Sequence, residues 1–129
     1  MADPVVPVSW GELLDKIAIL EIKRERLRSP EAVANTEREL AALGPALTAL
    51  RAPPLGLAEL RAALAAVNHR LWTIEDRIRE KDAKGDFGPG FVALARSVYR
   101  ENDERVRIKQ AINALLGSGL VEEKQYSRY

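Results

Sequence analysis

The chain has 129 residues, a length that fits one domain able to bury a core without metals or disulfides. Its 20 Lys and Arg and 19 Asp and Glu are interspersed rather than blocked, which argues against a nucleic-acid-binding surface. Cysteine is absent and there is one histidine, so disulfides, thiolate metal sites, thiol nucleophiles and histidine-rich zinc sites are excluded. We expect neither a metal nor a cofactor.

The N-terminus lacks the basic region and apolar run of a signal peptide. No later segment holds the roughly twenty uninterrupted apolar residues that a membrane-spanning helix needs. We therefore expect a cytoplasmic protein whose partners are neither membranes nor nucleic acids.

The first predicted helix covers residues 9–28 and carries the strongest pattern in the chain. Ser9 followed by Glu12 is the S-x-x-E sequence that caps a helix N-terminus. Apolar residues occupy two of its sides: Leu13, Ile17 and Leu20 on one, Ile19 and Ile22 on the other. Because two sides must be covered by neighbours, the pattern predicts the central helix of a bundle.

The second and third predicted helices cover residues 31–51 and 57–82. The second has a weaker apolar face that is broken at Gly44-Pro45, which is typical of a peripheral helix. The third follows a proline-rich turn and repeats apolar residues at three- and four-residue spacing. Its sustained heptad indicates a seam that needs a partner along its whole length.

A loop and a fourth helix complete the chain. Three glycines and a proline between Lys84 and Gly90 cannot continue a helix, and a fourth helix is predicted over residues 91–116. The polar tail, residues 117–129, could either dock on the bundle or fray.

The resulting fold class is all-α: an antiparallel bundle of three long helices and one shorter, interrupted helix, in a single domain over residues 1–129. At 1.5 Å per residue the third and fourth helices would each span about 40 Å, which is long for a compact monomer of this size. Together with the heptad, this length predicts a homodimer.

Polar residues occupy helix edges where a bundle would normally place apolar ones. They are Asn68, Trp72, Glu75 and Arg79 on the third helix, Asn102 and Lys109 on the fourth, and Lys16 and Lys23 on the first. If these edges face one another, each buried amide or charge needs a partner from the protein or from a ligand.

Two interpretations of these edges remain open. In the first, the three lysines attract a carboxylate or phosphate, Asn68 and Asn102 orient it, Trp72 and Arg79 line the same site, and Glu75 acts as acid or base. In the second, the side chains pair with one another and set the helix register and dimer pairing.

Four blocks of the sequence resemble a bacterial family of small uncharacterised proteins of about this length. The blocks are VSWGELLDKIAILEIKRERL, NHRLWTIEDRI, GDFGPGFVALARSVYRENDERVRIKQAIN and LVEEKQYSRY. The family is a domain of unknown function with no assigned activity. The resemblance implies that the first helix, the LWTIED segment, the Asn102-Asp103 pair and the tail form one unit, which favours a docked tail.

The first helix alone also resembles that of the all-helical chorismate mutases, through Asp15, Ile19, Leu20 and Arg26. Those enzymes bind a dicarboxylate between the helices of a dimer with Arg and Lys. The resemblance implies that the three lysines and Glu75 could imitate that chemistry, although their positions do not align residue by residue.

Two functional hypotheses follow. The first is a non-catalytic accessory or regulatory protein, a homodimer that acts through a protein partner or binds a small anionic ligand. The second is a small helical enzyme, an isomerase or lyase, acting on an anionic metabolite with Glu75 as the proton handler.

Overall fold

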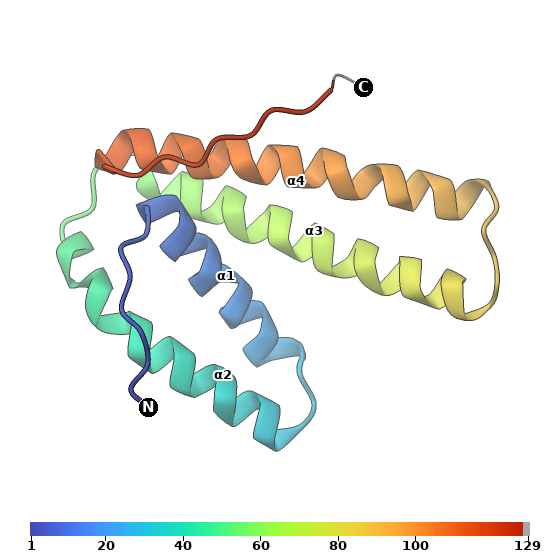
Figure 1. Cartoon of the computed structure of the whole chain (residues 1–129), viewed down its shortest axis with the longest axis horizontal. Coiled ribbons are helices and arrows are strands. Elements are labelled where there is room, and N and C mark those ends of the chain that lie inside the picture. Colours follow the sequence, from blue (N-terminus) through green and yellow to red (C-terminus); the bar gives the residue numbers. More distant parts are fainter. Residues whose placement is uncertain (128–129) are drawn as a thin grey trace.

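The computed structural model describes residues 1–127, which are helical without any strand (Figure 1). The elements are α1 (Trp10–Arg26), α2 (Pro30–Leu43), a short 3₁₀ helix η1 (Gly44–Leu50), α3 (Leu57–Ala83) and α4 (Pro89–Leu116). Helices α1 and α2 form one antiparallel pair, and α3 and α4 form another. The predicted all-α bundle is confirmed. Within residues 1–127, no helix combines the length and apolar character needed to cross a bilayer.

The helix ends follow local side-chain chemistry. The Ser9 hydroxyl accepts a hydrogen bond of 3.1 Å from the Glu12 backbone N–H and caps α1, as the S-x-x-E pattern predicts. We expected the fourth helix to begin at about residue 91, and α4 begins two residues earlier, at Pro89. Proline is favoured in the first turn of a helix, where its missing N–H is not needed, so the loop is two residues shorter than expected.

Helix α1 is the centre of the bundle. It contacts α2, α3 and α4, whereas α2 contacts only α1 and η1 among the described elements. The predicted break at Gly44 is where α2 gives way to η1. The main core cluster joins α1, α3 and α4 through buried side chains: Leu14, Leu57, Leu64, Val67, Ile108 and Ile112.

The hairpin of α3 and α4 extends beyond α1 and α2 (Figure 1). Past Leu71 in α3 and before Val106 in α4, neither helix contains a buried residue. Apolar side chains such as Ile78 and Leu94 are therefore only partly covered in this outer half of the hairpin. Phe87 and Phe91 pack edge to face at its tip, with ring centroids 5.2 Å apart.

The C-terminal tail turns back along α4 (Figure 1). Gly117 has φ 66°, a left-handed conformation that suits glycine at a helix C-terminus, and reverses the chain. Ser118 Oγ then accepts a hydrogen bond of 2.9 Å from the Trp10 backbone N–H. Gln110 Nε2 donates one of 3.1 Å to the Glu122 carbonyl. The tail is thus docked at least as far as Glu122, while residues 128 and 129 lie outside the described residues.

Candidate functional site

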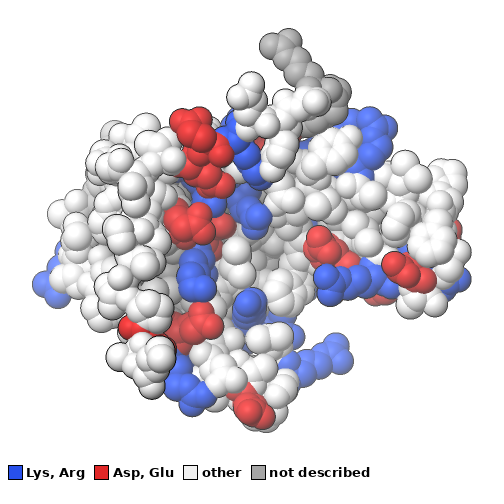
Figure 2. Space-filling model, in the orientation of Figure 1, with Lys and Arg blue, Asp and Glu red and all other residues white. Residues whose placement is uncertain are grey.

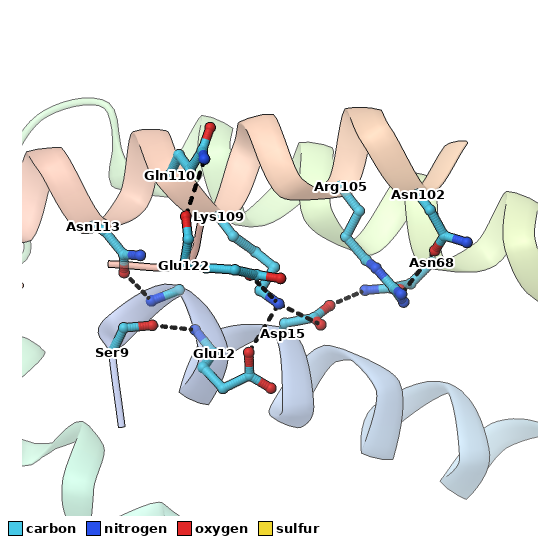
Figure 3. Close-up of polar contacts among 11 residues, drawn as sticks. Ser9, Glu12, Asp15, Asn68, Asn102, Arg105, Lys109, Gln110, Asn113 and Glu122 are labelled. Carbon is cyan, nitrogen blue, oxygen red and sulfur yellow. Dashed lines mark hydrogen bonds and ion pairs between the residues drawn. The ribbon is translucent and has the colours of Figure 1, made fainter. Parts of the chain in front are cut away.

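A buried lysine lies where α1, α4 and the tail meet (Figure 3). The side chain of Lys109 is 7% exposed. Its Nζ lies 2.7 Å from Glu122 Oε2, 2.9 Å from Glu12 Oε2 and 3.7 Å from Asp15 Oδ2. One ammonium group therefore joins two carboxylates of α1 to one of the tail.

These carboxylates decide the charge state of Lys109. Burial alone would lower its pKa from the ordinary value of 10.5, because the charged form loses water. The adjoining carboxylates of Glu122 and Glu12, with the more distant Asp15, outweigh burial and raise the pKa. Lys109 is accordingly an ammonium ion throughout the neutral range.

The raised pKa predicts a loss of stability in alkaline solution. A folded-state pKa above the unfolded one means that the Lys109 network stabilises the fold fully below pH 10.5, and that this contribution is lost as the pH rises through the raised value. Urea denaturation between pH 8 and about pH 11.5 should show a decline that is smaller in Lys109→Met. An equal decline in both proteins would contradict the assignment.

A row of hydrogen bonds leads from this network to Arg105 (Figure 3). Asn68 Nδ2 donates to Asp15 Oδ1 at 2.8 Å, and Arg105 Nη1 donates to Asn68 Oδ1 at 3.1 Å. Arg105 Nη2 donates to Asn102 Oδ1 at 2.8 Å. Two amide oxygens thus hold the guanidinium from two helices.

An open groove begins at Arg105 and lies between α1, α3 and α4. Its volume is about 410 Å³, within the range of sites for small organic molecules. Its lining combines apolar, amide and charged side chains: Ile19, Ile22, Asn68, Leu71, Trp72, Glu75, Asp76, Arg79, Asn102 and Arg105.

The guanidinium of Arg105 has no carboxylate partner among the described residues. Both of its hydrogen bonds go to neutral amides, Asn68 and Asn102. Arg79, the other arginine of the groove, differs because its Nη2 lies 3.7 Å from Glu75 Oε2. Arg105 therefore has no direct carboxylate partner, and a guanidinium carries donors in a planar fork that matches a carboxylate or phosphate.

The structure brings together five of the eight residues predicted for a site. Those that line the groove are Asn68, Trp72, Glu75, Arg79 and Asn102.

The three predicted lysines do not line the groove. Lys109 is enclosed by carboxylates, Lys16 forms an exposed ion pair of 3.4 Å with Glu39, and Lys23 is partly buried on α1. The polar residues thus form two separate groups. One is a paired network around Lys109, and the other is an open groove whose inner end, beside the buried Asn68, is occupied by Arg105 and not by a lysine.

Sequence reasoning missed Arg105 and Asp76. Arg105 follows Asn102 by three residues, so helical spacing already placed both on one face of the fourth helix. It also missed the contact between Asn113 and the start of α1, where Asn113 Oδ1 accepts a hydrogen bond of 2.7 Å from the Gly11 N–H. No spacing rule predicts a bond between residues so far apart in the chain.

Charges of both signs are interspersed on the face shown in Figure 2. A surface of mixed charge does not attract ligands of one sign, so recognition of a ligand depends on the side chains that line the groove.

A family model described as a family of unknown function, DUF6165, matches residues 5–129 of the 129-residue chain. No curated protein and no solved structure matches the chain. The match confirms the resemblance to a family of small helical proteins without assigned function. Because it covers nearly the whole sequence, the chain belongs to the DUF6165 family.

Proposed function

We propose that this protein is a helical accessory or regulatory protein that binds a small organic anion in the groove between α1, α3 and α4. The observation that carries the proposal is Arg105, a guanidinium held by Asn68 and Asn102 and without a carboxylate partner among the described residues. An unpaired, partly buried cation is costly unless a ligand or water satisfies it, and an anion in the groove would do so.

The division of the polar residues supports a binding role for the groove. Lys109 already contacts three carboxylates, so this part of the cluster fits the interpretation in which polar side chains pair with one another. The groove contains donors, acceptors and an aromatic side chain next to open volume, as ligand sites usually do. Trp72 would supply the apolar surface and Asn102 would keep Arg105 oriented.

The alternative is a small helical enzyme, an isomerase or lyase of the chorismate-mutase type, acting on an anionic metabolite. It is favoured by Glu75, which lines the same groove as Arg105 and could transfer a proton to a bound molecule. Turnover of a bound anion that is lost in Glu75→Gln, with binding retained, would support the enzyme over the binding protein.

The binding proposal predicts that Arg105→Gln abolishes stabilisation by anions. In a thermal-shift screen of anionic metabolites, a ligand at a hundredfold over its dissociation constant adds about 2.7 kcal/mol and raises the midpoint by several degrees. That shift should vanish in Arg105→Gln and persist in Arg70→Gln. Arg70 is a matched control because it is on α3, outside the groove, and pairs with Glu101 at 2.9 Å. A shift that survives in Arg105→Gln would contradict the site.

Homodimer formation is part of the proposal, and the outer half of the α3–α4 hairpin supports it. Past Leu71 in α3 and before Val106 in α4 no residue is buried, so apolar side chains such as Ile78 and Leu94 are only partly covered within one chain. Light scattering should give the mass of two chains, and Ile78→Glu/Leu94→Glu should give the mass of one. A wild-type mass of one chain at micromolar concentration would contradict the dimer.

A further inference from the structure

Along α3, the side chains that line the groove change in a fixed order from amide to aromatic to carboxylate. Asn68, which holds Arg105, is followed by Trp72 after four residues and by Glu75 after three more. All of these residues line the groove. The rise of a helix over seven residues is about 10.5 Å, so the inner cation and the outer carboxylate lie at opposite ends of an apolar stretch.

The side chains that line the two ends carry opposite net charge. Among the lining residues of the inner end only Arg105 is charged, since Asn68 and Asn102 are neutral. At the outer end the carboxylates of Glu75 and Asp76 face one guanidinium, Arg79, which leaves one negative charge in excess.

The middle of the groove is apolar. Ile19 and Ile22 of α1 line it together with Leu71 and Trp72 of α3. An indole next to aliphatic side chains provides a surface for a flat hydrocarbon body.

We propose that the groove selects a zwitterion: a small molecule with a carboxylate at Arg105, a flat apolar body against Trp72, and an ammonium group at Glu75 and Asp76. This inference rests on the proposed function and names the class of its ligand. A dianion is disfavoured, since its second negative group would lie against the carboxylates of the outer end. A molecule whose two charged groups are joined through one aromatic ring matches this order of cation, apolar surface and carboxylates.

Three probes of nearly equal shape test this selectivity by calorimetry. They are 4-(aminomethyl)benzoate, with an ammonium group opposite the carboxylate; 4-methylbenzoate, with a methyl group there; and terephthalate, with a second carboxylate. In low salt we expect 4-(aminomethyl)benzoate to bind several-fold tighter than 4-methylbenzoate, and terephthalate to bind weakest. The differences are moderate because the outer carboxylates contact solvent, and the side chain of Glu75 is 46% exposed.

A double variant isolates the outer end of the groove. In Glu75→Gln/Asp76→Asn the preference for 4-(aminomethyl)benzoate over 4-methylbenzoate should fall to less than twofold, and terephthalate should gain affinity. Both positions are partly or fully exposed, so the variant is expected to fold. An unchanged preference would overturn the inference.

The variant Arg105→Gln separates this inference from the proposed function. If terephthalate binds tightest to the wild type and loses affinity in Arg105→Gln, the zwitterion inference fails while the anion site stands. If no carboxylate probe binds in a manner that depends on Arg105, both fail. Circular dichroism melting of Arg105→Gln, with Arg105→Lys as a second variant that keeps the charge but lacks the fork, verifies that any loss reflects the groove and not unfolding.

Discussion

Replacing Gly11 by alanine is expected to lower the free energy of unfolding by about 2 to 3 kcal/mol, a typical cost of overpacking a tight contact. A Cβ at this position of α1 would lie 2.6 Å from the Lys109 carbonyl oxygen and 3.0 Å from Asn113 Oδ1. The carbonyl is part of the α4 backbone and cannot rotate away, so the two helices would have to separate. Urea denaturation followed by circular dichroism measures the difference.

Gly44→Ala is the matched control. Apart from the chain neighbours, no heavy atom lies within 4 Å of a Cβ built there, and the residue already has helical angles, φ −52° and ψ −44°. Alanine should change stability by less than about 1 kcal/mol, since it loses less backbone entropy on folding, while the following Pro45 disfavours helical angles at a residue with a Cβ. If both variants lost the same free energy of unfolding, the idea that Gly11 is needed for the close approach of α1 to α4 would be contradicted.

Replacing Lys109 by methionine is expected to lower the free energy of unfolding by about 3 to 5 kcal/mol, the usual cost of removing one partner of a buried ion pair. The reason is mainly Asp15, whose side chain is 7% exposed and would keep a buried charge without its cation. Glu122 would lose its contact of 2.7 Å as well, so the tail should detach from α4. Urea denaturation gives the stability change, and limited proteolysis gives the release of the tail.

Lys16→Met is the control for this variant. Lys16 is also a lysine of an ion pair, with Glu39 at 3.4 Å, but the two side chains are 56% and 53% exposed. Such a pair contributes at most about 1 kcal/mol, so the substitution should be nearly neutral. A Lys109→Met protein as stable as Lys16→Met would contradict the network as a determinant of the fold.

Much of the fold could be predicted from the sequence because helices are indicated by patterns of residues that lie close together in the chain. The S-x-x-E pattern at Ser9, the two apolar sides of α1 and the break at Gly44 depend on residues a few positions apart. The start of α4 was predicted less accurately. Proline and glycine are unfavourable in the interior of a helix, but Pro89 and Gly90 lie in its first turn, where they are tolerated.

The candidate site could be predicted only in part, for a physical reason. Periodicity places a side chain on a helix face but does not say how the helices cross. Lys109 and Asn102 share a helix, yet Lys109 meets Glu12 and the tail, while Asn102 lies at the groove with Arg105. The tail carries no periodic pattern, so the position of Glu122 beside Lys109 could not be foreseen.

The most direct test of the anion site is the response of the Trp72 indole N–H signal in a ¹H–¹⁵N spectrum during titration with 4-(aminomethyl)benzoate. The chain has two tryptophans, and Trp10, which packs against the core cluster at the start of α1, is the internal reference. We predict that the Trp72 signal shifts in a saturable manner, that Trp10 stays in place, and that Arg105→Gln abolishes the shift. No change at Trp72 with either this probe or terephthalate, or an equal change in Arg105→Gln, would contradict the anion site at Arg105.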